Sequence, residues 1–388
     1  MKVEQLKNIP QDKVFGSKTH NIRLKKAFFC KEITTLVSRK SKTEMKTQEL
    51  LLNYLKHKPN SSSKEIFEGL NFVVSYATVK RCLSSLLSEK HITKQGNAKN
   101  SRYALSPTFN LFYPINLDEY YSKEIDEREI LTGYNFSLIS ETLQNVPLLT
   151  AEELILLNDL QNKFSENIAQ LSDFEYEKDM ERLAIDLSWK SSQIEGNTYS
   201  LLETERLLKD KQTASGKTKD EAIMLLNHKD AIDFVVANSD YFLSLSVAKI
   251  EELHSILIKE LGVNKNIRTR RVGITGTNYR PLDNEFQIRE ALQQTCDLIN
   301  NREIIFEKAL FALVLLSYLQ AFSDGNKRVA RITANALLIA NKHCPISFRT
   351  VDAVDYKKAM LLFYEQNNIS AFKQIFINQF KFAVENYF

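Results

Sequence analysis

Long amphipathic stretches, seldom interrupted by residues that break helices, are the feature that most constrains this chain. Only 10 glycines and 7 prolines occur among its 388 residues. Apolar residues recur about every 3.6 positions, for example in residues 150–171 and 219–238, as on one face of an amphipathic helix. The small number of glycines and prolines also disfavours a turn-rich all-β architecture. We therefore predict a mainly α fold, with core enough for two or three domains.

Charge is distributed unevenly along the chain. Residues 1–105 hold 21 Lys and Arg against 8 Asp and Glu, a net charge of +13. The remainder holds 31 against 40, a net charge of −9. This division predicts two modules with different partners, and a polyanion would suit the basic one.

Cysteine spacing and hydropathy predict a cytoplasmic protein without membrane association. The four cysteines match no zinc or redox spacing and are expected to be reduced thiols: Cys30, Cys82, Cys296 and Cys344. The N-terminal residues are too polar for a signal peptide. The longest apolar run, residues 309–319, is about half the length of a membrane span and predicts a buried helix instead.

Residues 43–108 resemble a winged helix-turn-helix domain, preceded by a basic segment, residues 1–42, that stays unassigned. Three helical patterns are followed by two β-like runs around a Gly-Asn turn, and Ser62 and Glu65 have the spacing of a capping box. In such domains the third helix enters the major groove of double-stranded DNA and the hairpin contacts phosphates. The resemblance implies these DNA-binding residues: Tyr76, Thr78, Lys80, Arg81, Lys94, Lys99 and Arg102. Use of the domain for protein contact or homodimerisation is the alternative.

The stretch LQAFSDGNKRVAR, residues 319–331, has the pattern of a phosphate-binding turn that opens a helix. A turn at residues 323–326 would expose backbone N–H groups at the positive end of a helix beginning near Lys327. Arg328 and Arg331 are three residues apart and can project on one face. Asp324 offers a hard oxygen ligand for Mg²⁺. An ordinary helix start with solvated charges is the alternative, and P-loop spacing is absent.

The same stretch resembles the Fic-domain signature H-P-F-x-D-G-N-G/K-R-x-x-R, with Phe322, Asp324, Gly325, Asn326, Arg328 and Arg331 in register. A second segment, SSQIEGN, resembles the inhibitory motif S-x-x-x-E-G/N of one Fic class, with these residues in its positions: Ser191, Glu195, Gly196 and Asn197. The resemblance covers residues 109–388, with an inhibitory helix at about 175–197 and the core motif at 320–331. It implies an all-helical Fic fold with one β-hairpin flap.

Fic domains typically bind ATP and transfer AMP to a hydroxyl of a protein target, so the resemblance implies a Ser, Thr or Tyr hydroxyl as acceptor. It implies ATP binding through Asp324, Gly325, Asn326, Lys327, Arg328 and Arg331, with Asp324 coordinating Mg²⁺. Glu195 would pair with Arg331 and occupy the space of the γ-phosphate. The flap, expected in RRVGITGTNYRP, would align the target through Val272, Gly273, Ile274, Thr275 and Gly276.

Two positions of the signature affect the chemistry. Gln320 stands where the family has its general-base His, and a Gln amide cannot take up a proton near neutral pH. A lost base costs on the order of 10²–10⁴ in rate. Lys327 stands where many members have Gly. We therefore predict weak or no AMP transfer and a nucleotide-responsive, DNA-binding regulatory role. An active nucleotidyl- or phosphotransferase with unusual chemistry, and a non-enzymatic scaffold or antitoxin-like partner, are the alternatives. His254 and His343 either approach the site or belong to the core.

Overall fold

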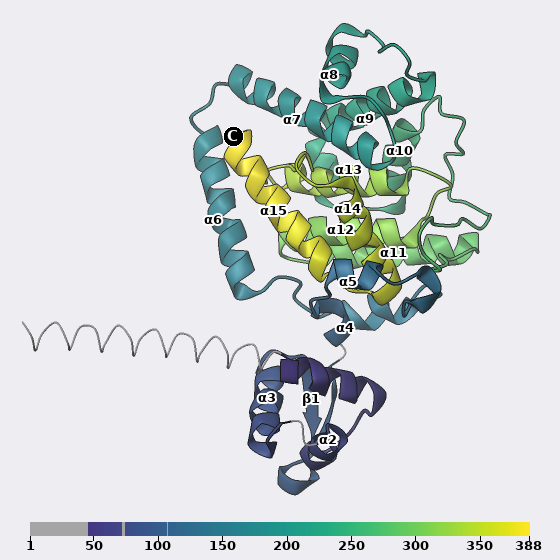
Figure 1. Cartoon of the computed structure of the whole chain (residues 1–388). Helices are drawn as coiled ribbons and strands as arrows, with labels where there is room; N and C mark the ends of the chain where they lie inside the picture. The colour runs from purple at the N-terminus through teal and green to yellow at the C-terminus, as the bar shows by residue number, and fades with distance from the viewer. Residues whose placement is uncertain (1–45, 72–73, 107) are drawn as a thin grey trace, which may run out of the picture. The chain divides into compact units, whose positions relative to one another are not determined.

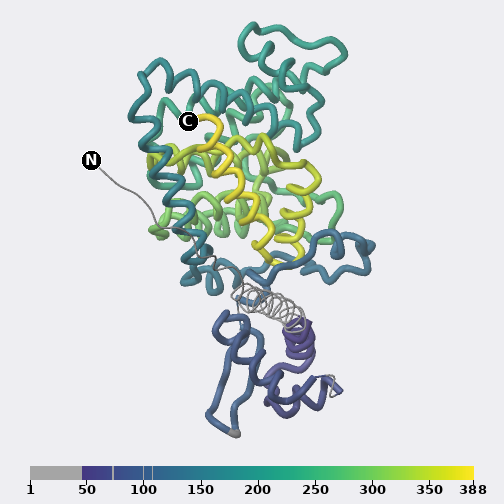
Figure 2. Tube along the Cα trace, turned by 60° about the vertical axis from the view of Figure 1, so that its left-hand side comes forward, coloured from purple at the N-terminus to yellow at the C-terminus, as the bar shows by residue number. Residues whose placement is uncertain are grey.

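The computed structural model describes residues 46–388 except residues 72, 73 and 107. The basic segment 1–42 and Cys30 therefore lie outside the described residues. The chain divides into two compact units, Met1–Phe109 and Asn110–Phe388. Figure 1 colours them from purple to yellow along the sequence, and Figure 2 follows the same trace from another side.

The described part of the first unit contains three helices followed by a hairpin, the order that the sequence predicts. A helix at residues 46–57 precedes α2 (Ser63–Gly69) and α3 (Tyr76–Ser88). The antiparallel strands β1 (Ile92–Gln95) and β2 (Arg102–Leu105) follow, with the short 3₁₀ helix η1 (Ala98–Asn100) between them. The Ser62–Glu65 capping box is confirmed. An isolated bridge between Ser61 and Tyr103 adds a third backbone segment beside β2, which the sequence did not predict.

The second unit is built almost entirely from helices, which confirms the predicted mainly α fold. Many begin at a Ser, Thr or Asn whose side chain accepts a hydrogen bond from the first turn, as in α7 and α9. Their bounds are α4 (Phe109–Phe112), α5 (Leu117–Tyr121), η2 (Ile125–Glu127), η3 (Leu138–Thr142), α6 (Ala151–Ile168), α7 (Asp173–Ile194), α8 (Leu201–Asp210), α9 (Lys219–Ala237), η4 (Ser239–Leu243), α10 (Val247–Leu257), α11 (Glu285–Asn300), α12 (Ile305–Leu319), α13 (Asn326–Ala340), α14 (Ala353–Gln366) and α15 (Ser370–Asn386).

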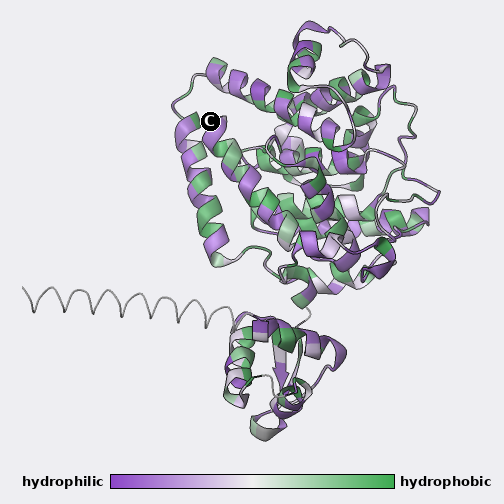
Figure 3. Ribbon diagram, viewed as in Figure 1, coloured by the Kyte–Doolittle hydropathy of each residue, from purple (hydrophilic) through white to green (hydrophobic). Residues whose placement is uncertain are grey.

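Helices α12 and α13 form the centre of this unit. Residues 309–319 of α12 are all buried, because a helix that is apolar on every side must be covered on every side. Helix α13 packs along α12 and is covered by α7, α9 and α10, while α11, α14 and α15 contact α12. In Figure 3 the outer helices carry both hydrophilic and hydrophobic faces. The central pair therefore fixes the six residues that join it, 320–325, at a defined place in the core.

The predicted β-hairpin flap is wrong in its secondary structure. Residues 271–279 contain no strand, and Arg280 forms only an isolated bridge with Gly133. A two-stranded hairpin without further strands is marginally stable. Here the backbone groups of this segment bind other partners instead: the Arg280 amide donates to the Thr132 carbonyl at 3.0 Å. The segment is an extended loop with a turn at residues 275–276, and we call it the flap loop.

Cys82, Cys296 and Cys344 are buried thiols. Across residues 46–388, apart from the three undescribed positions, no helix has the length and apolarity needed to cross a membrane.

Candidate functional site

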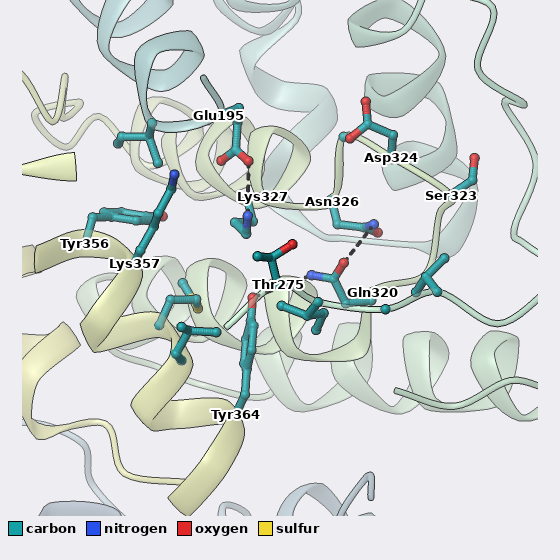
Figure 4. A pocket seen from close by; sticks show the side chains of 17 residues that line it. Glu195, Thr275, Gln320, Ser323, Asp324, Asn326, Lys327, Tyr356, Lys357 and Tyr364 are labelled. Atoms are coloured by element: carbon teal, nitrogen blue, oxygen red, sulfur yellow. Dashed lines mark hydrogen bonds and ion pairs between the residues drawn. The ribbon is translucent and has the colours of Figure 1, made fainter. Parts of the chain in front are cut away.

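A cavity of about 370 Å³ lies where the α12–α13 turn, the end of α7, the flap loop and α14 meet. The turn contributes Ser323, Asp324, Gly325, Asn326 and Lys327, and the end of α7 contributes Ile194 and Glu195. Figure 4 shows the side chains of Glu195 and Lys327 facing each other, with Asn326 beside them. Residues that are more than 100 positions apart in the sequence are therefore neighbours in one site.

The turn itself depends on Gly325. This residue has φ +83°, the left-handed region that favours glycine. A Cβ there would also lie 3.4 Å from both His254 and Ile258. The Asn326 side chain closes the turn by accepting from the Phe322 amide at 2.8 Å and donating to the Phe322 carbonyl at 2.7 Å. The predicted helix start is observed one residue early, at Asn326, and no side chain caps its first amides.

Arg328 and Arg331 have different hydrogen-bond partners, although both are almost fully buried. Arg328 donates to the Asp324 carboxylate at 2.8 Å and to the Leu257 carbonyl at 3.3 Å, and it does not line the cavity. Arg331 instead lies against α7. Its Nε donates to the Ser191 hydroxyl at 2.7 Å and its Nη2 to the Ser191 carbonyl at 3.0 Å. In this structure Arg328 therefore positions Asp324, and Arg331 joins α13 to the inhibitory-motif segment.

Glu195 lies between two cations. Its Oε1 is 2.8 Å from Nη2 of Arg331, and its Oε2 is 3.1 Å from Nζ of Lys327. The three residues form what we call the Glu195 ion-pair cluster. Gly196, at φ +102°, follows directly and turns the chain away from the end of α7. Burial by itself raises the pKa of Glu195, but the two cations outweigh it and hold the pKa at about 2. The carboxylate is therefore charged at any physiological pH.

Gln320 lines the cavity, and its side chain is hydrogen-bonded at both ends. Its Nε2 donates to the Ser317 carbonyl at 2.6 Å, and its Oε1 accepts from Nδ2 of Asn326 at 3.2 Å (Figure 4). Its backbone has φ +52°, unusual for a residue other than glycine. Arg268 stabilises this conformation by donating through Nε to the Gln320 carbonyl at 2.6 Å. Gln320 thus holds the turn in place and offers the cavity no group that takes up a proton.

Neither His254 nor His343 lines the cavity. His254 is fully buried and stacks on Phe322 with ring centroids 3.7 Å apart. Its ring nitrogens lie 3.2 Å from the Lys265 carbonyl and 3.0 Å from the Asp324 carbonyl, and burial lowers its pKa. His343 packs against Phe306, at the opposite end of α13 from the turn. His254 supports the turn from behind, and the base position is not refilled by either ring.

Helix α14 forms a wall of the cavity that the sequence did not predict. It contributes Tyr356, Lys357, Met360, Leu361 and Tyr364. Burial raises the pKa of Tyr364 well above its usual value, so its hydroxyl stays protonated. Nothing in the sequence beyond a helical pattern marks these residues, because their role depends on where α14 packs.

The flap loop contributes Val272, Gly273, Ile274 and Thr275 to the cavity, whereas Gly276 faces a neighbouring one. A buried ion pair stabilises the turn at residues 275–276 of the flap loop. Arg128 donates to both oxygens of Glu365 at 3.0 and 3.2 Å and to the Gly276 carbonyl at 3.0 Å. Tyr120 donates to the same carboxylate at 2.8 Å. No motif in the sequence marks Arg128 or Glu365, which are separated by 237 positions.

In the first unit, the predicted DNA-contacting residues lie on the start of α3 and on the hairpin. Lys80 lies over the exposed ring of Tyr76, 4.8 Å from its centroid, and Thr78 accepts or donates a hydrogen bond with Ser75 at 2.9 Å. Arg81 and Lys94 are exposed. Arg102 forms an ion pair with Glu65 of α2, so its charge is partly compensated within the unit. The side chain of Lys99 lies outside what the structure describes.

A helical unit whose D-G-N-K-R turn meets a glutamate at the end of an earlier helix has the features of a Fic domain. Residues 244–338 match the model of the Fic/DOC family. The match begins before α10 and ends within α13, so it includes the flap loop, Gln320 and the turn but not Glu195.

Curated relatives are similar at low identity. Protein adenylyltransferase fic-1 of Caenorhabditis elegans is 24% identical over 42% of this chain and 33% of its own length. Protein adenylyltransferase Fic of Nematostella vectensis is 27% identical over 43% of this chain and 40% of its own length. The matched region thus spans two fifths or less of each of these relatives.

Solved structures share the fold. Fic-1 from C. elegans, residues 134–508, superposes with a TM-score of 0.54 at 21% identity, over 64% of this chain and 76% of that one. A Fic-domain signalling protein from Bacteroides thetaiotaomicron gives a TM-score of 0.51 at 17% identity, over 59% of this chain and 94% of that one. At these identities the superpositions support the fold alone.

Proposed function

We propose that this protein binds ATP with Mg²⁺ in the cavity beside the α12–α13 turn, and that Glu195 opposes this binding. The observation that carries the proposal is the Glu195 ion-pair cluster, in which one carboxylate neutralises Lys327, which lines that cavity, and the fully buried Arg331. Arg331 and Lys327 are the cations that a terminal phosphate would otherwise attract. The names of the two curated relatives, both adenylyltransferases, agree with a nucleotide as ligand.

The cavity has two chemically different sides, as a nucleotide requires. Apolar side chains of the flap loop and α14 suit a base: Val272, Ile274, Met360 and Leu361. The start of α13 suits phosphates, because its first amides carry no side-chain cap and the helix end is positive. The Nη1 of Arg331 is buried and donates no hydrogen bond to any described residue. An unsatisfied buried donor is costly, and a phosphate oxygen would satisfy it.

Asp324 is the residue that would hold Mg²⁺. Its side chain is 62% exposed, and the described residues include no group of three or more His, Cys, Asp or Glu suited to a metal. One carboxylate with phosphate oxygens and water is an ordinary environment for Mg²⁺ beside a nucleotide. The ion would neutralise charge on the phosphates.

AMP transfer would proceed weakly from this site. In the reaction a target hydroxyl oxygen forms a bond to the α-phosphorus, the bond from that phosphorus to the bridging oxygen breaks, and pyrophosphate leaves. The hydroxyl proton needs an acceptor, and Gln320 provides none. Its amide is already bonded to Ser317 and Asn326. We therefore propose nucleotide binding as the principal property and slow transfer to a protein hydroxyl as a residual one.

Calorimetry with ATP and Mg²⁺ tests this proposal. We expect weak binding by the wild type, and binding tighter by on the order of tenfold or more in Glu195→Gly, because the two cations of the cluster lose their internal counter-ion. Glu205→Gln, which alters an exposed ion pair on α8, is the control and should leave affinity unchanged. Failure of both wild type and Glu195→Gly to bind would leave the scaffold or antitoxin-like alternative. Rapid labelling of a protein by wild type, lost in Asp324→Ala, would instead favour the active transferase.

A second proposed function is DNA binding by the first unit. It rests on the net charge of +13 in residues 1–105 and on the exposure of Lys80, Arg81 and Lys94. Such contacts to phosphates give affinity that falls steeply with salt. A nucleotide in the second unit would then regulate this binding.

A further inference from the structure

Lys327 is the second partner of Glu195, in addition to the arginine that the motif implies. Its Nζ lies 3.1 Å from Glu195 Oε2, and its side chain lines the cavity with 25% exposure. Arg331, four residues later on the same helix, takes the other oxygen at 2.8 Å with no exposure. One carboxylate thus holds two cations from one face of α13.

We propose that Lys327 affects nucleotide affinity in opposite directions in the two states of Glu195. While Glu195 occupies the cluster, Lys327 holds it there and weakens nucleotide binding. Once Glu195 has left, Lys327 binds the terminal phosphate and strengthens nucleotide binding. This inference rests on the proposed nucleotide site and adds to it a residue that sets both its regulation and its preference for polyphosphates.

The weakening of nucleotide binding by Lys327 follows from the contacts of the Glu195 ion-pair cluster. A nucleotide phosphate can reach the cations only if Glu195 leaves both of them. Separating a largely buried carboxylate from a charged hydrogen-bond donor is costly, and each such donor adds to that cost. Removing Lys327 leaves Glu195 with Arg331 alone, so a phosphate displaces it more easily.

The second effect follows from the spacing of the same cations. Lys327 and Arg331 already hold two oxygens of one carboxylate, and two oxygens of one phosphate present a comparable pair of acceptors. The Nη1 of Arg331, without a hydrogen bond to the described residues, would gain a further acceptor. With Glu195 gone, two adjacent cations also repel each other, and an anion of higher charge compensates them better. ATP and ADP should therefore depend on Lys327 more than AMP does.

Lys357 provides a matched control. It is a lysine that lines the same cavity from α14, and the structure gives it no hydrogen bond or ion pair with any described residue. Its replacement cannot weaken the hold on Glu195. Any effect of Lys357 on nucleotide affinity should therefore have the same sign whether Glu195 is present or not.

The experiment measures ATP, ADP and AMP affinity with Mg²⁺ in the full chain for four proteins: wild type, Lys327→Met, Glu195→Gly and the double variant. We expect Lys327→Met to tighten ATP binding by roughly tenfold in the wild-type background and to weaken it by roughly tenfold in the Glu195→Gly background. Lys357→Met should act in one direction in both backgrounds. An effect of Lys327→Met with the same sign in both backgrounds overturns the inference.

A thermal double-mutant cycle without nucleotide separates this inference from the proposed function. Glu195→Gln, Lys327→Met and their combination should change the unfolding midpoint non-additively, by about 2–4 °C for a coupling of one charged contact. Additive changes in the unfolding midpoint overturn the inference that Lys327 holds Glu195 in the ion-pair cluster. A clear coupling together with no ATP binding by Glu195→Gly overturns the proposed function and the inferred contact of Lys327 with phosphate. The role of Lys327 in holding Glu195 would still be supported.

Discussion

Glu195 Oε1 and Arg331 Nη2 lie 2.8 Å apart, although 136 positions separate the two residues in the sequence. The contact joins the end of α7 to the helix that follows the signature turn, and Lys327 reinforces it from the same helix. Because α12 and α13 are packed in the centre of the unit, this contact lies on a rigid support.

The Glu195 ion-pair cluster should not respond to pH in the physiological range. The pKa of Glu195 is about 2, below the usual value near 4.3. A lowered carboxyl pKa gives stability that is present above the usual value and is lost only as the pH falls toward 2. The ratio of ATP affinities between Glu195→Gly and wild type should therefore stay constant within about twofold from pH 6 to 8, by calorimetry. A wild-type affinity that approaches that of the variant at pH 6 would contradict this.

Restoring a base should restore transfer. Gln320→His combined with Glu195→Gly places an imidazole at the position of the family's base while the phosphate-binding cations are uncompensated. We expect AMP transfer from labelled ATP to rise by about 10²–10⁴ over Glu195→Gly alone. Adding Asp324→Ala should abolish the gain.

The outcome of this restoration also depends on the turn. The Gln320 side chain bonds Ser317 and Asn326, and a histidine there forms different contacts. The unfolding midpoint and ATP affinity of the double variant should be measured alongside. A double variant that folds and binds ATP but transfers no AMP would show that the proton acceptor is not the missing element.

Arg128 should stabilise the second unit strongly. Its side chain is 4% exposed and its partner Glu365 is fully buried. Arg128→Met leaves that carboxylate without its cation and releases the Gly276 carbonyl, so the free energy of unfolding should fall by about 3–5 kcal/mol. Chemical denaturation with fluorescence from Trp189 in this unit measures it.

The matched control for Arg128 is Arg271, which pairs with Asp283 and is 86% exposed. Arg271→Met should change stability by at most about 1 kcal/mol, because solvent screens the pair. Arg128→Met with Glu365→Met should recover part of the loss, since no buried charge is left unpaired. Equal effects of Arg128→Met and Arg271→Met would argue against a special role for the buried pair.

DNA binding should depend on α3. Lys80→Glu with Arg81→Glu changes the net charge of the first unit by −4 and should abolish binding to duplex DNA at about 0.1 M salt. Fluorescence anisotropy across a salt series measures it. Lys259→Glu, an exposed substitution in the second unit, should leave the binding intact. An intact protein with no affinity for DNA even at low salt would contradict the DNA-binding proposal.

Much of the fold and part of the site could be predicted from local sequence. Helices and their capping boxes, such as Ser62–Glu65 and Ser200–Glu203, were predictable because each involves residues within one turn of helix. The D-G-N-K-R turn was predictable because its residues are contiguous. The flap hairpin was predicted wrongly, because the family resemblance does not reveal that Arg128 and Thr132 bind that segment's backbone.

The sequence by itself determined the helical class, the charge difference between the two modules, and the presence of Gln320 at the base position. Only the tertiary structure decided that Lys327 shares Glu195 with Arg331, that α14 forms a wall of the cavity, and that Arg328 turns away to Asp324. The physical reason is the range of the interactions. Periodicity and capping act within a few residues, whereas these contacts join segments brought together by the packing of a common core.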